Sequence, residues 1–271
     1  MKNPRVSVIT VCYNCGTVLK GTAISVLSQT YKDFDYIIVD GGSKDNTICV
    51  IDEIKAIAYK RNIPVTSISE SDKGVYDAMN KGNRMATGNY ILYMNAGDYF
   101  FTKDSLEKFC TALDDSTDVL YGNTQMVYNW GEIINRPPIP TIDNPMPFIH
   151  QSCLTKREAL LKHPFDLSYK IIADHNLYYQ LMNEGAIFTY NPVTVAKYDA
   201  RNGISADNPY NQYVEHARIH GFTKQWWYPL RKFYYMCRFG LQMRIKALLP
   251  KRYKDNIERK RREKLFNAKA Q

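Results

Sequence analysis

The sequence predicts an α/β fold, in which a largely parallel sheet is flanked by helices and followed by a helical, basic and aromatic tail. Three observations lead to this prediction. Short apolar runs alternate with helical stretches four times within about 95 residues of the N-terminus. The first run, 6–14, is continuously apolar and β-branched, as expected of a strand buried on both faces. From Lys224 onward, lysine and arginine far outnumber acidic residues, although the rest of the chain is slightly acidic.

The elements of the first half can be assigned in order. A helix should follow the first strand and end near Tyr31. A second strand ends at Asp40 before two glycines, and a helix over 46–61 leads to a third strand at 64–70. The stretch 72–88 is predicted to be a helix and 89–94 a fourth strand. Units of this kind build parallel sheets with right-handed crossovers.

The second half is less regular. Residues 118–134 predict antiparallel strands around turns at Gly122-Asn123 and at Gly131. The proline-rich stretch 136–147 predicts an irregular surface loop and is a candidate lid. A helix is expected from Asp174 to Glu184, followed by one or two strands in 186–199.

Polar side chains stand at or just after the ends of the four predicted strands, namely Asn14, Asp40, Asp72 and Asp98. In parallel sheets ligands bind beyond the carboxyl ends of the strands, so the four residues predict one shared crevice. Each of them alone could instead cap a helix or form a turn. No G-x-x-x-x-G-K-[ST] or G-x-G-x-x-G motif is present. A rim of carboxylates can still hold a nucleotide diphosphate through Mg²⁺ or Mn²⁺.

Several stretches occur in the order seen in family 2 glycosyltransferases: "VSVITVCYN", "IIVDGGSKDNT", "SESDKGVYDAMNKGNRMATGNYILYMNAGD", "HQSCL" and "ADHNLYYQL". Over about residues 5 to 205 the chain resembles the non-processive bacterial enzymes of capsule, exopolysaccharide and colanic-acid assembly. The resemblance implies a GT-A fold, with a Rossmann-like nucleotide-binding half at 1–98 and an acceptor half at 99–205. Residues 206–271 would then form a helical extension.

The resemblance also implies roles for single residues. Asp98 matches the last acid of the family's D-x-D metal motif, while Asn95 stands where an acid is common. Asp174 falls where the family keeps the base of an inverting transfer. His150 and Gln151 are weaker candidates for the acceptor side. Nucleotide-binding roles are implied for Thr10, Val11, Asn14, Asp40, Gly41, Asp72, Lys73 and Asn95.

The tail, 225–266, interleaves aromatic residues with lysine and arginine. This composition suits a helix at an anionic membrane surface, although the aromatic residues could instead pack on the catalytic domain. Nucleic acid is not expected as a partner, given the slightly acidic body. The N-terminus lacks the features of a signal peptide, so we expect a cytoplasmic protein, peripheral on the inner face of the plasma membrane.

The function predicted is therefore an inverting glycosyltransferase, dependent on Mn²⁺ or Mg²⁺. It would move a sugar from a nucleotide-diphosphate donor, most commonly a UDP-sugar in this family, to a hydroxyl of a lipid-linked glycan. Two alternatives remain at this point. One is a catalytically idle, membrane-associated protein that binds nucleotide sugars, and the other is a sugar nucleotidyltransferase. The sugar, the linkage and the oligomeric state are not given by the sequence.

Overall fold

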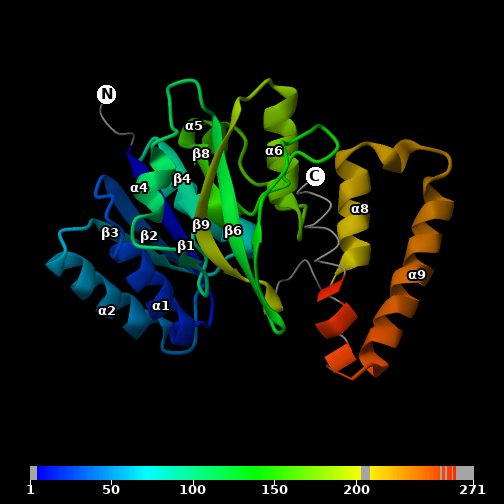
Figure 1. Cartoon of the computed structure of the whole chain (residues 1–271), viewed down its shortest axis with the longest axis horizontal. Coiled ribbons are helices and arrows are strands. Elements are labelled where there is room, and N and C mark those ends of the chain that lie inside the picture. Colours follow the sequence, from blue (N-terminus) through cyan, green and yellow to red (C-terminus); the bar gives the residue numbers. More distant parts are fainter. Residues whose placement is uncertain (1–4, 203–207, 251, 254, 258, 261–271) are drawn as a thin grey trace.

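The computed structural model describes residues 5–202, 208–250, 252, 253, 255–257, 259 and 260. Its centre is a mixed sheet of nine strands in the order β3-β2-β1-β4-β8-β6-β9-β5, with β7 paired to β6. Helices cover both faces of this sheet (Figure 1). The predicted α/β class is therefore confirmed.

The first half is the parallel part of the sheet. Strands β1 (Val6–Cys12), β2 (Phe34–Asp40), β3 (Val65–Ser69) and β4 (Tyr90–Tyr93) run parallel to one another. They alternate with helices α1 (Gly16–Leu27), α2 (Thr47–Lys60) and α3 (Val75–Met85). Every residue of β1 and β2 is buried, as the continuous apolar runs predict.

The second half extends this sheet with antiparallel and parallel pairs. Its strands are β5 (Tyr99–Phe100), β6 (Val119–Tyr128), β7 (Gly131–Asn135), β8 (Cys153–Lys156) and β9 (Phe188–Asp199). Strand β8 pairs antiparallel to both β4 and β6, whereas β9 runs parallel to β6. Short helices α4 (Ser105–Cys110), η1 (His150–Ser152), α5 (Arg157–Lys162) and η2 (Ala200–Asn202) lie between or after them, and α6 (Ala173–Asn183) precedes β9.

One predicted turn is wrong. Strand β6 continues through Gly122 and Asn123, and the register with β9 shifts there instead. A Cβ atom on Gly122 would lie 2.8 Å from the carbonyl oxygen of Val193. A glycine at this position therefore allows β6 and β9 to approach closely. The turn at Gly131 is confirmed, because β6 and β7 form a hairpin around it. The proline-rich segment carries only an isolated bridge between Thr141 and Asn144, as expected of an irregular loop.

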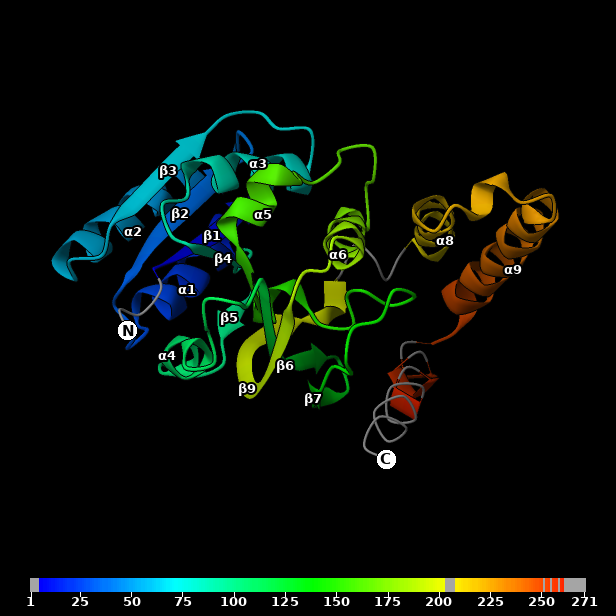
Figure 2. The ribbon, with the colours of Figure 1, turned by 90° about the horizontal axis from the view of Figure 1, so that it is seen from above.

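Two apolar cores hold the layers together. One contains Leu19 of α1, Ile54 of α2 and Phe109 of α4 under one face of the sheet. The other contains Met79 of α3 and Leu177 of α6 under the opposite face (Figure 2). The layers place the carboxyl ends of β1 and β4 and the first turn of α6 around one hollow.

The C-terminal helices α8 (Pro209–Ile219) and α9 (Tyr228–Leu248) are joined by η3 (Phe222–Lys224). Both views show α8 beside α6, with α9 on the outer side of α8 (Figures 1 and 2). Glu215 of α8 accepts hydrogen bonds from the backbone N–H groups of residues 170, 171 and 172, just before α6. In the part of the chain described, no helix combines the length and the apolar character needed to cross a membrane. The rest of the predicted tail, 261–266, lies outside the described residues.

Candidate functional site

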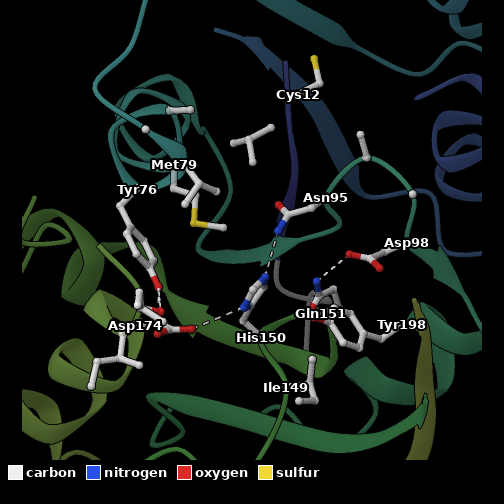
Figure 3. A pocket seen from close by; sticks show the side chains of 18 of the residues that line it. Cys12, Tyr76, Met79, Asn95, Asp98, Ile149, His150, Gln151, Asp174 and Tyr198 are labelled. Atoms are coloured by element: carbon white, nitrogen blue, oxygen red, sulfur yellow. Dashed lines mark hydrogen bonds and ion pairs between the residues drawn. The ribbon is translucent and has the colours of Figure 1, made fainter. Parts of the chain in front are cut away.

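The main hollow of the molecule is a cavity of about 740 Å³ at the carboxyl ends of the parallel strands. Its walls come from the end of β1, the turn after β4, η1 and the first turn of α6. Figure 3 shows Asp98 on one side of this cavity and Asp174 on the other, with Asn95, His150 and Gln151 between them. The structure thus brings together both acids for which chemical roles were predicted.

The turn after β4 fixes the position of Asp98. Its backbone N–H donates to the carbonyl of Asn95 at 2.9 Å, which closes a four-residue turn. Gly97, the third residue, has φ of +101°, a conformation that side chains disfavour. Its N–H donates to Thr22 of α1 at 2.9 Å. The sequence Asn-Ala-Gly-Asp therefore folds back at the end of the strand and turns the acid into the cavity.

Asp98 is almost fully buried, with 5% of its surface exposed. One carboxylate oxygen accepts from the side-chain amide of Gln151 at 2.6 Å, and the other from the backbone N–H of Asp199 at 3.3 Å. Burial raises the pKa of Asp98 to about 6, against the opposing effects of the Gln151 hydrogen bond and the nearby His150. A buried carboxylate without a cationic partner is costly, and a bound cation would relieve that cost.

The surroundings of Asp98 fit a divalent metal. Two buried side-chain oxygens, Oδ1 of Asn95 and Oε1 of Gln151, accept no hydrogen bond. Amide oxygens without a hydrogen-bond partner are donors that Mg²⁺ and Mn²⁺ accept, and the amide of Gln151 contacts Asp98 directly. Asn95 can therefore contribute an oxygen although it is not an acid.

A second array surrounds Asp174. Nδ2 of Asn95 lies 3.0 Å from Nε2 of His150, and Nδ1 of His150 lies 3.6 Å from a carboxylate oxygen of Asp174. Because an amide NH₂ can only donate, Nε2 accepts and the ring proton is placed on Nδ1, which faces Asp174. The other carboxylate oxygen accepts from the hydroxyl of Tyr76 at 3.2 Å and from the N–H of His175 at 2.9 Å. The acid is held at the start of α6, at the edge of the cavity.

Tyr76 was not predicted as a site residue. Its single hydroxyl hydrogen is shared between Asp174 and the carbonyl of Ile171, which is the nearer acceptor at 2.7 Å, and burial raises its pKa well above the usual range. It therefore stays protonated and ties α3 to the segment before α6. The only sequence signal is its place in the "DKGVYDAMN" stretch, where nothing identifies its partner.

The residues predicted to bind the nucleotide divide into two groups. Val11, Asp72 and Asn95 line the main cavity, and Gly41 lines a second hollow of about 470 Å³ beside it. A Cβ atom on Gly41 would lie 2.5 Å from the Asp72 carboxylate, so the backbone and this acid are in close contact.

The other predicted residues do not line either hollow. Asp40 is fully buried and accepts hydrogen bonds from Ser43 and Ser69 as well as from the N–H of Gly42, so its carboxylate shapes its own loop. Thr10 is also fully buried, and its hydroxyl donates to the carbonyl of Met94 at 2.6 Å. Contacts of these two residues with a nucleotide remain predictions.

Asn14 and Lys73 lie on loops at the same edge. Asn14 is exposed, and its side chain accepts from the N–H of Lys44 at 2.8 Å, which links the loops after β1 and β2. The N–H of Lys73 donates to Asp77 at 3.0 Å. Nucleotide contacts of Asn14 and Lys73 also remain predictions.

A sheet whose parallel half ends at a carboxylate-lined cavity, with an antiparallel half supplying the opposite wall, is the architecture of GT-A glycosyltransferases. The chain belongs to the family described as "Glycosyl transferase family 2", whose model matches residues 7–166. It is therefore a glycosyltransferase, as the resemblance implied.

Named relatives agree with this assignment. A "PGL/p-HBAD biosynthesis glycosyltransferase" of Mycobacterium bovis (strain BCG / Pasteur 1173P2) is 29% identical over 214 residues, 76% of this chain and 80% of the relative. A "UDP-Glc:alpha-D-GlcNAc-diphosphoundecaprenol beta-1,3-glucosyltransferase WfaP" of Escherichia coli is 37% identical over 100 residues, 36% of this chain and 37% of that protein.

Solved structures share the fold. The mannosyltransferase PcManGT from Pyrobaculum calidifontis, in complex with GDP-Man and Mn²⁺, superposes with a TM-score of 0.62 at 17% identity, over 80% of this chain and 65% of that one. S. aureus TarS 1-349 in complex with UDP superposes with a TM-score of 0.59 at 18% identity, over 79% and 64%. This chain thus spans just under two thirds of the length of these solved chains.

Proposed function

We propose that the protein is a metal-dependent, inverting, non-processive glycosyltransferase. It moves one sugar from a nucleotide-diphosphate donor to a hydroxyl of a lipid-linked glycan. The observation that carries the proposal is the placement of two carboxylates, Asp98 and Asp174, on opposite sides of one cavity.

Asp98 is the residue that would hold the metal, with the free amide oxygens of Asn95 and Gln151 as further donors. A divalent cation bound there supplies Lewis-acid stabilisation of the diphosphate as it leaves, worth several kcal/mol. The Gln151 amide now bonds an oxygen of Asp98, so metal binding requires this side chain to turn its own oxygen inward. The Asp98 carboxylate thus has a partner in both states: the Gln151 amide N–H in the metal-free protein and the cation in the metal-bound protein.

Asp174 acts as the general base. It takes the proton of the acceptor hydroxyl while that oxygen attacks the anomeric carbon. Its position across the cavity from Asp98 suits attack on the face opposite the leaving diphosphate, which inverts the configuration. No second carboxylic acid is needed to protonate the leaving group, in contrast to a glycosidase. His150, whose Nδ1 lies 3.6 Å from the Asp174 carboxylate, is near enough to help position this acid.

The donor and acceptor are proposed by analogy. A UDP-sugar donor is supported by the name of the E. coli relative and by the UDP in the S. aureus structure. A diphosphate-lipid acceptor is supported by the "diphosphoundecaprenol" in that relative's name. Such an acceptor lies at the cytoplasmic face of the membrane, which fits the cytoplasmic, peripheral location expected from the sequence and a role in surface polysaccharide synthesis.

The C-terminal part supports contact with an anionic membrane surface. On and before α9, the apolar side chains of Trp226, Leu230 and Phe233 are 84%, 71% and 63% exposed, so they do not pack on the catalytic body. Exposed Lys232 and Arg238 lie among them. Exposed aromatic and aliphatic groups with interspersed cations are typical of helices that lie in a headgroup layer.

The test measures binding and turnover separately. A thermal-shift panel of nucleoside diphosphates, each with and without Mn²⁺, is run on the wild type, Asp98→Ala and Asp174→Asn. One nucleotide should stabilise the wild type only with Mn²⁺, by about 2.7 kcal/mol at a hundred times its Kd. Asp98→Ala should lose this effect and Asp174→Asn should keep it. Exposed Asp52→Asn is the matched control.

Turnover is followed as hydrolysis of the matching nucleotide sugar, and then as transfer to a diphosphate-lipid acceptor. We expect Asp174→Asn to lower kcat about 10²- to 10⁴-fold. Binding without any turnover by the wild type would favour the idle nucleotide-sugar binder instead. A wild type that no nucleotide stabilises would overturn the donor site itself.

A further inference from the structure

Three of the five histidines of the chain gather at one place beside the cavity, and no role in sugar transfer is assigned to their side chains. His175 lies in the first turn of α6, His216 lies in the last turn of α8, and His220 is the capping residue directly after α8, four residues after His216. One ring nitrogen from each of the three falls within 4.8 Å of the others. Among the described residues, this is the one group of three or more such side chains that could hold a metal ion.

The spacing is close to that of a metal site. Nε2 of His175 and Nε2 of His220 are 3.5 Å apart. Nitrogens bound to one Zn²⁺ at about 2.0–2.1 Å in tetrahedral geometry lie about 3.4 Å from each other. All three nitrogens lie within 4.8 Å of one another, so they are near enough to approach a single ion. Two histidines at i and i+4 on one helix face can ligate together, as in helical H-x-x-x-H pairs.

The surroundings favour imidazoles that are neutral and held in place. Burial and the neighbouring His216 lower the pKa of His175 to about 4, and burial also lowers the pKa values of His216 and His220. Neutral imidazole is the form that binds metal. The ring of Phe222 stacks on His220 at 5.7 Å, and Tyr179 meets it edge-on at 4.9 Å. The cluster is therefore preorganised by aromatic packing.

A negative charge faces the same cluster from a third element. The Asp143 carboxylate, on the proline-rich loop, acts electrostatically on His216 and His220. Asp143 is exposed and does not belong to the group within ligand distance, so its negative charge would offset part of the charge of a bound cation from outside the set of ligands.

We propose that His175, His216 and His220 bind one first-row transition-metal ion, with Zn²⁺ as the expected occupant, and so fasten α8 to α6. Nitrogen ligands select Zn²⁺ over the Mg²⁺ and Mn²⁺ that suit the oxygen donors around Asp98. The site joins the C-terminal helices to the turn that carries Asp174, because Asp174 directly precedes His175 in the chain. It does not depend on the proposed sugar transfer, because its test reads metal binding alone.

The test uses the full chain without a histidine tag. The protein is stripped with a chelator and dialysed against ZnCl₂ in excess Mg²⁺, and bound zinc is measured by elemental analysis. We expect one zinc per chain in the wild type, and at least a 100-fold higher Kd in His216→Ala/His220→Ala. His163→Ala, which removes a histidine paired with Glu184 elsewhere on the surface, should bind as the wild type does. Co²⁺ in place of Zn²⁺ should give the visible absorption of tetrahedral coordination in the wild type and in His163→Ala.

Two results would overturn the proposal. One is a wild type that retains no zinc above the level of the double variant. The other is an equal loss of zinc in His163→Ala, which would mark the binding as nonspecific. Should the double variant not fold, the wild type alone decides: Zn²⁺ must raise its unfolding midpoint in excess Mg²⁺, and an unchanged midpoint contradicts the site.

Discussion

At the scale of single residues, the buried Asp98 carboxylate lowers the stability of the folded protein and has a proposed role in metal binding. Its carboxylate is buried with only neutral hydrogen-bond donors in direct contact, and burial raises its pKa to about 6. Under the proposed function this cost is retained because the charged form of Asp98 would bind the metal cation. A buried acid that destabilises the metal-free protein is thus typical of a functional position.

The first prediction concerns the stability of the metal-free protein. The pKa of Asp98 is higher in the folded than in the unfolded state, so protonated Asp98 favours the folded protein. This contribution to the free energy of unfolding is fully present below about pH 4 and is lost as the pH rises through about 6. In EDTA we expect Asp98→Asn to be more stable than the wild type at pH 8, by on the order of 2 kcal/mol, and not at pH 4. Urea unfolding at the two pH values measures this difference.

The matched control for this experiment is Asp52→Asn, an exposed position that should show no such pH dependence. With Mn²⁺ and nucleotide present the order should reverse, because only the wild type gains binding energy. A variant equal to the wild type at pH 8 in EDTA would show that the charge of Asp98 is compensated in the folded protein.

The second prediction concerns His150, which contacts Asn95 and lies 3.6 Å from Asp174, the proposed base. His150→Ala removes the ring that orients Asp174, so we expect kcat to fall about 10-fold while the KM for the donor stays within about 2-fold. The pH profile of kcat should also change shape. His163→Ala is the control. A loss of donor binding instead would place His150 on the donor rather than on Asp174.

The pattern of the sequence predicts a site residue where the backbone determines its place. Asp98 follows a strand, so topology brings it to the edge of the sheet, whereas the role of Asp174, at the start of α6, was implied only by the family resemblance. Asp40 is the last residue of strand β2, yet Ser43 and Ser69 satisfy its carboxylate away from the cavity. Whether a polar side chain turns inward or outward depends on partners distant in the chain, which the local pattern does not contain.

At the scale of elements, the first half could be assigned almost completely, because continuous apolar strands alternating with helical stretches give strong local signals, although the helix predicted over 72–88 spans only Val75–Met85. The second half could not. Gly122 was read as a turn residue, although it allows β6 and β9 to approach closely within a continuous strand. The histidines of α6 and α8 were missed for a similar reason, since they meet only when the two helices pack side by side.

The third prediction concerns the attachment of α8. The Glu215 carboxylate accepts three backbone N–H groups, at 2.7, 3.0 and 3.0 Å, in the segment leading to Asp174. Hydrogen bonds to a charged acceptor are the stronger kind, so Glu215→Ala should lower the free energy of unfolding by about 2 kcal/mol. It should also lower kcat, because the turn before Asp174 loses its support. Chemical denaturation and steady-state kinetics measure the two effects.

Glu53→Ala is the control for Glu215. Glu53 forms an exposed ion pair with Lys20 on the far side of the molecule, a contact worth less than about 1 kcal/mol. If Glu215→Ala changed neither stability nor kcat more than Glu53→Ala does, α8 would not be needed to hold the catalytic turn.

At the scale of the whole molecule, charge and apolar exposure are divided between two regions. The sequence before Lys224 is slightly acidic, whereas the remainder is strongly basic. Helix α9 carries exposed Leu230, Phe233 and Leu241 on the outer side of α8, away from the sheet. Helix α9, the proposed membrane-binding region, thus lies next to α8, and α8 lies beside α6, whose first turn lines the cavity proposed to receive the acceptor.

The fourth prediction is that this region binds anionic lipid. The full chain should sediment with vesicles rich in phosphatidylglycerol and not with pure phosphatidylcholine, and binding should weaken as salt rises. One variant replaces three exposed cations of α9 with glutamate: Lys232→Glu, Arg238→Glu and Arg244→Glu. Lipid binding should weaken at least 100-fold, since each cation near an anionic surface contributes about 1 kcal/mol. A control variant makes the same change in net charge on the catalytic body, with Lys60→Glu, Arg84→Glu and Lys103→Glu. It should weaken lipid binding much less. Equal losses in the two triple variants would mean that only net charge matters, and transfer to a lipid-linked acceptor would then have to proceed without a dedicated membrane-binding helix.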